Sequence, residues 1–402
     1  MFATQQGQFR QSLAAILAMM IIVTVTLWVT SPDPLGNIDS FEELPLAMSL
    51  APIDQAATLA QVRRKDGTVA TLWVVSLSDD GLTAIDLSAV TGNTDLNPLS
   101  VWSDVPPERR TALLKRSTDY QTFSNAQLLS VAPVGDRHIG TGTNFPEHAE
   151  EALSTSVFQF PKFGHARGPR SSVKWHDDVL LDYEVELCVR FDRNISSLDD
   201  FDAAMVGVFL CGDFTDRSAL VRLVDPDNLD SGRGFSDGKS RADFFPTGAL
   251  LVVPENVDRF VNAERMTTEV NGTLRQDARG GEMTLTFREL AQKALADMTT
   301  ARFLYRDNFY TLAPNADIDT SMALMSGTAE GVIFTPPSRG DLIEGVVNWV
   351  ISGAILRAEP LIPHVIEVFI NNELASGHFL QPGDTVAHRA AHLGDILIEV
   401  IK

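Results

Sequence analysis

The stretch that decides the fold is residues 181–189, LDYEVELCV, a strand-like run with two glutamates where a buried strand usually carries valine or leucine. Residues two apart in a strand point to the same face, so Glu184 and Glu186 direct their carboxylates to one side. Two buried carboxylates are unfavourable unless a cation neutralises them. Ligands that are all oxygen suit Mg²⁺, or else Mn²⁺ or Ca²⁺. The alternative is an edge strand whose second face meets water.

A third acid, Asp213, ends the apolar run VGVFLCGD of residues 206–213. An acid at a strand end is commonly a turn residue or a helix cap. Beside Glu184 and Glu186 it would instead supply a third oxygen ligand. Three carboxylates leave coordination positions open for water or substrate, so this pattern predicts a divalent-metal site that supports chemistry.

Composition limits the classes of partner. Among 402 residues there are 53 acids and 32 bases, a formal net charge of -21. Such an acidic surface repels phosphate backbones, which argues against nucleic acid as a partner. The cysteines, Cys188 and Cys211, lie in apolar runs and are interpreted as buried free thiols, because two cysteines make neither a disulfide framework nor a zinc finger.

The amino-terminal segment predicts a membrane anchor within residues 1–32. Residues 11–32 carry no charged side chain, and the length of their apolar core, residues 14–29, is close to the ~20 residues that a bilayer-spanning helix needs. Arg10 precedes the run and acids follow it, which favours a single-pass protein with its body periplasmic or otherwise extracytoplasmic. A cleaved signal peptide is the alternative, and the protein would then be secreted.

The rest of the chain divides into three predicted parts. Residues 33–55 contain prolines among acids and are interpreted as a linker. Residues 56–136 alternate apolar and polar positions, with turns at KDG (65–67) and SDDG (78–81), and predict a small amino-terminal α+β domain. The third part is the body, residues 137–402.

The body is rich in short β-type runs separated by glycine and proline, which favours an antiparallel roll or barrel. A turn is predicted at NGT (271–273), and residues 286–296 show a helical pattern. Neither GxGxxG nor GxxxxGK[ST] occurs, so dinucleotide and P-loop chemistry have no support. The predicted fold class is α+β, mostly β. Residues 333–375 are interpreted as an insertion, whose apolar stretch 344–356 predicts a buried helix or an interface element.

The body carries a series of short motifs: GTNFPEHAEE (142–151), DYEVEL (182–187), GDFTDRS (212–218), GKSRADFFPTG (238–248), VNGTLRQ (270–276), SGTAEGV (326–332) and PGDTV (382–386). In this order they resemble the motifs of the fumarylacetoacetate hydrolase family. Several motifs in the right order are much harder to obtain by chance than one. The resemblance implies a β-roll or barrel preceded by a small amino-terminal domain.

The resemblance implies a role for each matching residue. Glu184, Glu186 and Asp213 would bind the divalent metal, Lys239 would approach the substrate's oxygens, and Arg217 would offset negative charge on the substrate.

His148 and Glu151 would form a dyad that activates water from a mobile lid, and Thr328 with the backbone of Gly327 would hold the substrate's carboxylate. Physical chemistry agrees on the dyad, because residues three apart on a helix are neighbours and a carboxylate raises the basicity of an imidazole. A helical His/Glu pair is otherwise a solvated surface feature.

At some positions the sequence departs from the family pattern. These departures fall among the residues that would contact the substrate. The metal ligands are all retained, so the departures bear on the identity of the substrate and not on metal binding. The departing residues are Thr143, Phe145, Ser218, Leu220 and Ala329.

The predicted function is a divalent-metal-dependent hydrolase that cleaves a C–C bond in an acylpyruvate-like or diketo acid. One alternative is an isomerase, hydratase or decarboxylase of 2-oxo acids, because these reactions pass through a similar enolate. Another is a non-catalytic, membrane-anchored ligand-binding module. The expected partner is a small 2-oxo or diketo acid, and the resemblance implies a homodimer.

Overall fold

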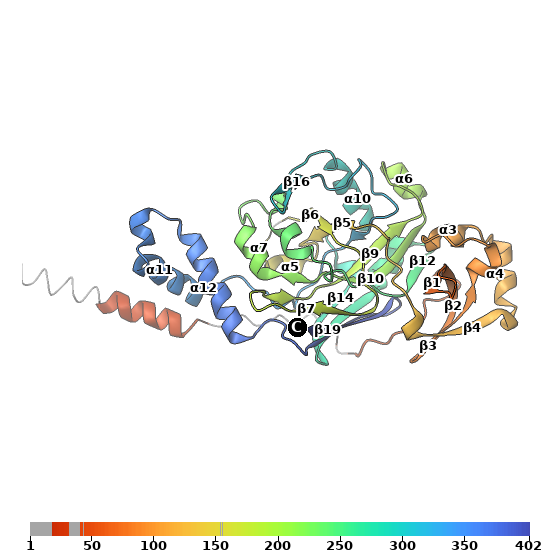
Figure 1. Ribbon diagram of the computed structural model, residues 1–402, viewed down its shortest axis with the longest axis horizontal. Coiled ribbons are helices and arrows are strands. Elements are labelled where there is room, and N and C mark those ends of the chain that lie inside the picture. Colours follow the sequence, from red (N-terminus) through yellow and green to blue (C-terminus); the bar gives the residue numbers. More distant parts are fainter. Residues whose placement is uncertain (1–17, 32–40, 43, 153, 155) are drawn as a thin grey trace, which may run out of the picture. The chain divides into compact units, whose positions relative to one another are not determined.

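The computed structural model describes residues 18–31, 41–42, 44–152, 154 and 156–402, and the chain divides into two compact units (Figure 1). The larger unit comprises residues 36–334 and 379–402, and the smaller one residues 1–35 and 335–378. Part of the predicted anchor (1–17 and 32) and part of the predicted linker (33–40 and 43) lie outside the described residues. The predicted domain boundaries stay predictions.

A ten-stranded sheet is the framework of the larger unit. The prediction was a roll or a barrel. Among the described strands β4 and β6 are the free ends of this sheet, so the sheet is open and these strands form no closed barrel. The β17–β5 pair is parallel, and the other pairs within this sheet are antiparallel. In sheet order, the strands are β4 (Tyr120–Ser124), β3 (Gly81–Asp86), β2 (Val69–Ser78), β1 (Ala56–Arg63), β12 (Leu251–Pro254), β10 (Val206–Gly212), β9 (Val185–Phe191), β17 (Leu324–Met325), β5 (Arg137–Gly142) and β6 (Phe158–Phe163).

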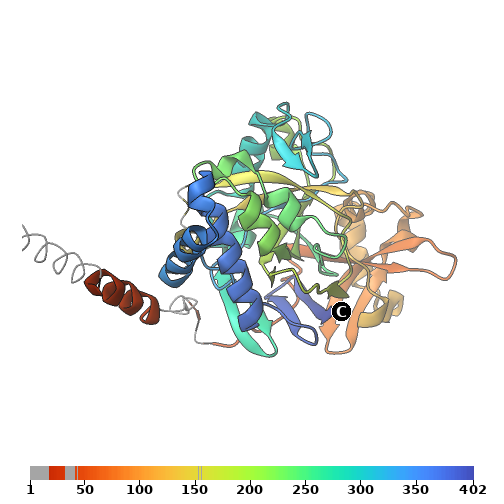
Figure 2. The same ribbon diagram turned by 60° about the vertical axis from the view of Figure 1, so that its left-hand side comes forward.

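The predicted amino-terminal turns are confirmed, and they lie within an antiparallel meander formed by β1 to β4. The chain reverses between β1 and β2 at Gly67, whose φ of 89° lies in the left-handed region that glycine adopts at little cost. The second predicted turn joins Ser78 of β2 to Gly81 of β3. β1 also pairs with β12, so the meander extends the sheet of the body (Figures 1 and 2).

A five-stranded sheet packs in the same unit, in the order β14-β13-β18-β19-β7. The predicted turn after residue 270 is confirmed, with Asn271 (φ 52°) and Gly272 (φ 77°) between β13 and β14. The strands are β14 (Thr273–Arg279), β13 (Arg265–Val270), β18 (Thr385–Ala390), β19 (Gly394–Ile401) and β7 (Arg170–Lys174); two short pairs add β8 (Leu181–Asp182) with β11 (Thr215–Asp216), and β15 (Phe303–Tyr305) with β16 (Asn308–Tyr310).

Short helices cover the sheets of the larger unit. The predicted helix near residues 286–296 is confirmed as α10, which begins after a capping box formed by Thr286 and Glu289. The helices are α2 (Leu87–Thr91), α3 (Pro98–Ser103), α4 (Pro107–Leu114), α5 (Pro146–Glu151), α6 (Leu198–Ala203), α7 (Arg217–Leu223), α8 (Phe235–Lys239), α9 (Val257–Ala263) and α10 (Phe287–Ala296), with 3₁₀ turns η1 (Ser117–Asp119), η2 (Asn125–Gln127), η3 (Leu229–Ser231) and η4 (Gly280–Glu282).

The stretch 181–189 is two strands rather than one. β8 pairs with β11, and β9 joins the large sheet, so Tyr183 and Glu184 lie at the joint between them. Both faces of the run are buried, which excludes the alternative of an edge strand facing water: Glu184 is 3% exposed and Glu186 is 0% exposed.

The expectation of two free thiols is wrong, because Cys188 and Cys211 form a disulfide. The register of β9 and β10 sets Cys211 opposite Glu186, two residues from Cys188. This diagonal offset leaves the two Cα atoms 6.0 Å apart, within the usual range of a disulfide.

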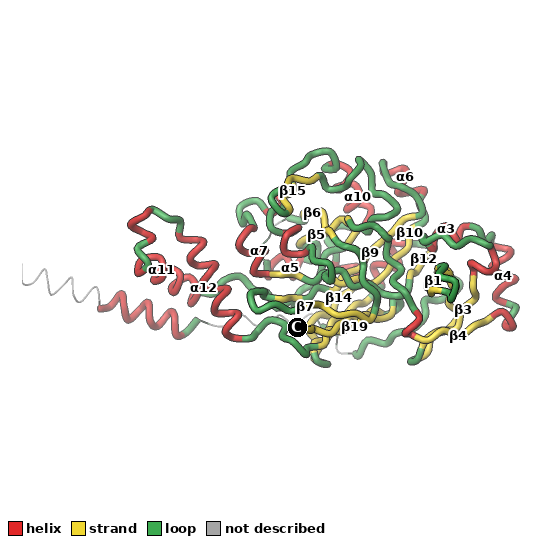
Figure 3. Tube along the Cα trace, in the orientation of Figure 1, coloured by secondary structure: helices red, strands yellow, loops and turns green. Residues whose placement is uncertain are grey.

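The smaller unit is helical in its described part (Figure 3). It contains helical residues 18–29 and, from the predicted insertion, α11 (Arg339–Ile351), η5 (Ala354–Arg357) and α12 (Leu361–Ser376). Trp28 Nε1 donates to Glu344 Oε1 at 2.6 Å, which joins the amino-terminal helix to α11. α11 is not the buried helix that its composition suggested, because only Gly340, Asp341 and Gly345 are buried in it.

The predicted single-pass membrane localisation is wrong. A search of the described helices finds none that combines the length and the apolar character needed to cross a bilayer.

Candidate active site

Glu184, Glu186 and Asp213 come together as their sequence pattern predicts. Each offers a carboxylate oxygen, these oxygens lie within 4.8 Å of one another, and all three residues are buried. Glu186 lies in β9, Glu184 is the residue just before that strand, and Asp213 is the residue just after β10. Because β9 and β10 pair in register, Asp213 N reaches Glu184 O at 2.9 Å. The predicted ligand cluster is therefore present as geometry.

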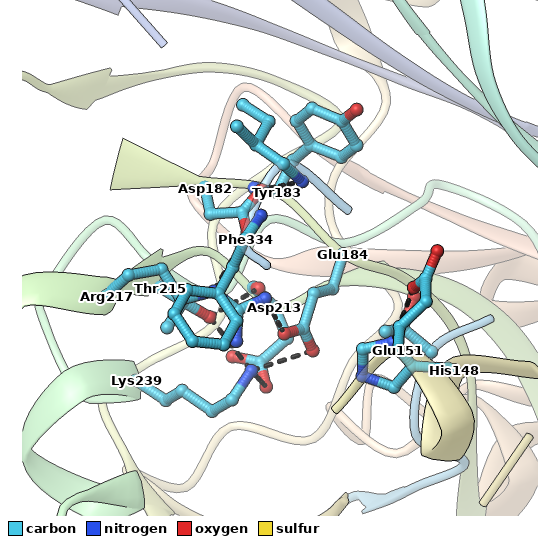
Figure 4. Close-up of polar contacts among 12 residues, drawn as sticks. His148, Glu151, Asp182, Tyr183, Glu184, Asp213, Thr215, Arg217, Lys239 and Phe334 are labelled. Carbon is cyan, nitrogen blue, oxygen red and sulfur yellow. Dashed lines mark hydrogen bonds and ion pairs between the residues drawn. The ribbon is translucent and has the colours of Figure 1, made fainter. Parts of the chain in front are cut away.

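Three buried cations surround these carboxylates, and two of them, Lys239 and Arg217, are labelled in Figure 4. Lys239 Nζ lies 2.7 Å from Glu184 Oε2 and 3.0 Å from Asp213 Oδ2. Arg217 donates from its terminal nitrogen to Glu184 Oε1 at 2.7 Å. Lys162 Nζ lies 2.5 Å from Asp213 Oδ1. Glu184 and Asp213 thus each lie beside oppositely charged groups.

The surroundings shift the two glutamates in opposite directions. Burial acts to raise the pKa of Glu184, but the charges of Lys239 and Arg217 outweigh it, and the pKa is lowered. Burial, with the negative charges of Asp213 and Glu184, raises the pKa of Glu186 well above its usual range. Glu186 is the carboxylate that the existing cations neutralise least.

Glu186 also supplies the observation that favours a metal. Its Oε2 accepts from Gly327 N at 2.9 Å, whereas its buried Oε1 has no hydrogen-bond partner within the described part of the chain. A buried carboxylate oxygen without a donor is unfavourable, and a cation would satisfy it. The all-oxygen donor set suits Mg²⁺, Mn²⁺ or Ca²⁺, so the residues fit a hard divalent ion.

His148 and Glu151 form the predicted pair on α5. His148 Nδ1 lies 3.3 Å from Glu151 Oε2, and both side chains are largely buried, at 10% and 17% exposure. Gly331 N donates to both oxygens of Glu151, at 3.1 and 3.3 Å. The pair lies close enough to Glu184 that the charge of His148 helps to lower the pKa of that carboxyl. In Figure 4 the pair lies on one side of Glu184, with Lys239 on the other.

Thr328 and Gly327 lie beside the carboxylates, but their polar groups are already paired. Thr328 Oγ1 donates to Val185 O at 2.8 Å, and Gly327 N donates to Glu186 Oε2. Gly327 has a φ of 81°, and a Cβ there would lie 3.2 Å from both Thr141 O and Asn144 Cβ, so the close approach of this loop requires glycine.

Two buried polar residues of the site were not assigned a role from the sequence. Lys162 is the lone cation in the apolar run FQFPKF, and this isolated charge is the sequence signal that could have marked it as a buried residue of the site. Gln276 accepts from Val185 N at 3.1 Å and donates to Thr328 Oγ1 at 2.9 Å. It therefore joins β14 to β9 and to the loop of residues 326–332.

Asp182 holds Arg217 and the backbone of residues 333–334 in place beside the site. It accepts from Arg217 Nε at 2.8 Å, and from Ile333 N and Phe334 N at 3.0 and 3.1 Å. The Phe334 ring lies over the Arg217 guanidinium, 5.2 Å from its carbon to the ring centroid. Residues 333–334 are therefore fixed against the arginine that holds Glu184.

The sequence profile described as "Fumarylacetoacetate (FAA) hydrolase C-terminal" matches residues 137–401, which is more than half of the chain. A curated relative, an uncharacterised protein of Staphylococcus aureus (strain USA300), is 27% identical over 187 residues, which cover 44% of this chain and 59% of the relative. The chain thus spans less than two thirds of that relative's length.

Solved structures show the same fold at low sequence identity. The fumarylacetoacetate hydrolase from Exiguobacterium antarcticum aligns with a TM-score of 0.52 at 17% identity, covering 86% of this chain and 99% of the other. The 2-hydroxyhepta-2,4-diene-1,7-dioate isomerase from Mycobacterium marinum aligns at 0.50 and 15%, covering 86% and 98%. The 5-carboxymethyl-2-hydroxymuconate delta-isomerase from Mycobacterium smegmatis aligns at 0.50 and 15%, covering 86% and 99%.

The family match and the fold agree with the buried carboxylate cluster, and the interpretation as a non-catalytic module is not retained. The chain belongs to the fumarylacetoacetate hydrolase family and is an enzyme of that family.

Proposed function

We propose that this enzyme is a divalent-metal-dependent hydrolase that cleaves a C–C bond in an acylpyruvate-like or diketo acid. The observation that carries the proposal is the carboxylate cluster of Glu184, Glu186 and Asp213, with the His148–Glu151 pair beside it. The cluster fits a hard cation, and the pair fits a general base that activates water.

Each residue of the site has a distinct role in this reaction. A divalent ion held by the three carboxylates would polarise the substrate's oxygens and stabilise the charge that develops as the bond breaks. His148, oriented by Glu151, accepts a proton from water, whose oxygen attacks the carbonyl carbon distal to the carboxylate. The C–C bond then breaks, the carbonyl side leaves as a carboxylic acid, and a proton is delivered to the carbon of the released 2-oxo acid. Lys239 and Arg217 offset the negative charge.

A second candidate is isomerisation or decarboxylation of a 2-oxo acid at the same site. The observation that favours it is the likeness of the fold to two proteins named isomerases. These reactions need the enolate but no attacking water, so they would depend less on His148. The proposed partner in either reaction is a small acid, and the resemblance to the family also suggests a homodimer.

The test is turnover by the full chain, with Mg²⁺, Mn²⁺ or Ca²⁺ and after chelation. Acylpyruvates of different chain length report hydrolysis, and oxaloacetate reports decarboxylation. We expect metal-dependent hydrolysis that falls roughly 100-fold or more in His148→Ala, the usual scale of general-base catalysis.

The chain offers a matched control for this variant. His378 lies 3.2 Å from Glu373 in an exposed ion pair of the same type, so His378→Ala should leave turnover unchanged. Decarboxylation that survives His148→Ala, without hydrolysis in the wild type, would favour the second candidate. Absence of metal-dependent turnover of every acid tested would refute the proposed function.

A further inference from the structure

Lys239 occupies an unusual place for a residue expected to face substrate. Its ammonium lies 2.7 Å from Glu184 Oε2 and 3.0 Å from Asp213 Oδ2, and it donates to Thr215 Oγ1 at 2.9 Å. The side chain is 4% exposed. The ammonium therefore bridges two of the three carboxylates that would bind the divalent ion, and its contacts are all directed at the site itself (Figure 4).

The contacts of Lys239 are those that a metal would take. A divalent ion of the Mg²⁺ type is held by carboxylate oxygens about 2.0–2.6 Å away, so it would be coordinated by the same groups that now receive the ammonium. Two cations that share these oxygens lie within a few ångströms and repel one another in a buried site. It is therefore unfavourable for the carboxylates to contact the Lys239 ammonium and a divalent ion closely at the same time.

The neighbouring lysine is bound differently. Lys162 Nζ lies 2.5 Å from Asp213 Oδ1 and donates to the backbone oxygens of Lys239 and Phe244, at 2.6 and 3.3 Å. Its side chain is 0% exposed. Its partners include two carbonyls that no metal would displace, and it uses the other oxygen of Asp213. Lys162 is thus a fixed counter-ion, whereas the partners of Lys239 are the proposed metal ligands and Thr215.

We propose that Lys239 holds the place of the divalent ion in the metal-free enzyme and releases Glu184 and Asp213 when the ion binds. The inference rests on the proposed metal-dependent function. Once released, the ammonium is available to an anionic group of the acid substrate, so metal binding precedes productive substrate binding. The exchange also keeps the carboxylates neutralised at every stage, which maintains the fold of the empty site.

The test is calorimetric titration of Mn²⁺ and of Mg²⁺ into the metal-free full chain and into Lys239→Met. Without the competing ammonium, the variant should bind the ion at least roughly tenfold more tightly. Thermal unfolding gives a second readout that needs no catalysis. The metal-free variant should melt below the wild type, and the ion should raise its Tm by more.

Two further variants make the result specific. Lys239→Arg keeps the positive charge and should return metal affinity toward that of the wild type. Lys293→Met removes an exposed lysine paired with Asp230 and should change neither affinity nor the metal-induced rise in Tm. Circular dichroism of each metal-free variant confirms that it is folded before titration.

The outcomes separate this inference from the proposed function. Equal or weaker metal binding by folded Lys239→Met would overturn the inference, even if the wild type hydrolyses acylpyruvates. Tighter binding by the variant would support it, even if no acid is turned over and the proposed function fails. Absence of ion binding in both wild type and variant would overturn it as well.

Discussion

At the scale of single residues, Asp182 shows how one carboxylate organises the site. Its two oxygens accept from Tyr183 N, Arg217 Nε, Ile333 N and Phe334 N, at 2.8 to 3.1 Å. It is 0% exposed, so no water replaces a lost partner. Because Arg217 in turn holds Glu184, the orientation of a proposed metal ligand depends on a residue that does not touch the metal.

Asp182→Asn should therefore destabilise the protein strongly. The amide keeps the size of the side chain, but its NH₂ group faces donors and leaves Arg217 with less negative charge beside it. We expect a loss of about 3 kcal/mol in the free energy of unfolding, the scale for breaking a buried charged contact. Urea unfolding of the metal-free protein measures it.

An exposed pair of the same type is the control. Arg170 contacts both oxygens of Asp395, but its side chain is 39% exposed and that of the acid 34%. Asp395→Asn should cost less than about 1 kcal/mol. Similar losses in the two variants would show that burial of Asp182 does not control its contribution.

The sequence predicted the residues whose chemistry depends on local spacing. Glu184 and Glu186 are two apart, and Asp213 follows a recognisable strand, so their convergence could be expected. Lys162 could not be placed, because its partner Asp213 lies 51 residues away and their contact joins β6, at one end of the sheet, to the residue that follows β10. The roles of the catalytic and substrate-binding residues stay predictions.

At the scale of elements, the β9–β10 pair is the support of the proposed metal ligands. The two strands pair from Val185 with Gly212 to Phe191 with Val206. The disulfide crosses this pair two residues from Asp213, with 23 residues separating its cysteines. The spacing of the two cysteines along the chain did not reveal this disulfide, because whether they face one another depends on the register between the two strands.

Cys188→Ala combined with Cys211→Ala should lower the free energy of unfolding by about 3 kcal/mol, from the chain-entropy estimate for a loop of this length. It should also weaken Mn²⁺ binding, because the strands that hold the three carboxylates lose their covalent link. Urea unfolding and calorimetry measure the two effects. Free thiols detected in the denatured wild type, or a double variant of equal stability, would contradict the prediction.

At the scale of the whole molecule, buried histidines join segments that are distant in sequence. His138 Nδ1 accepts from Ala323 N at 3.1 Å, and His388 Nδ1 lies 2.8 Å from Thr268 Oγ1. Burial lowers the pKa of both histidines to about 3, with the charge of Lys162 adding to the effect at His138. Both are therefore neutral in the folded protein while their unfolded counterparts titrate near 6.5.

His388→Asn tests this linkage through the pH dependence of stability. Above the unfolded pKa of 6.5 neither state of the histidine is protonated, so wild type and variant differ by a constant amount. As the pH falls from 6.5 toward 3, the unfolded wild type binds a proton that the folded protein does not, and only the wild type loses this stability. The stability of the wild type relative to the variant should fall by about 1.4 kcal/mol per pH unit. His392→Asn should show the opposite sign, because the hydrogen bond that His392 donates to Glu264 raises the pKa of His392. This bond gives stability that is present at low pH and lost as the pH rises. Urea midpoints at pH 7, 6 and 5 measure both trends, and a pH-independent difference for His388→Asn would contradict the neutral buried imidazole.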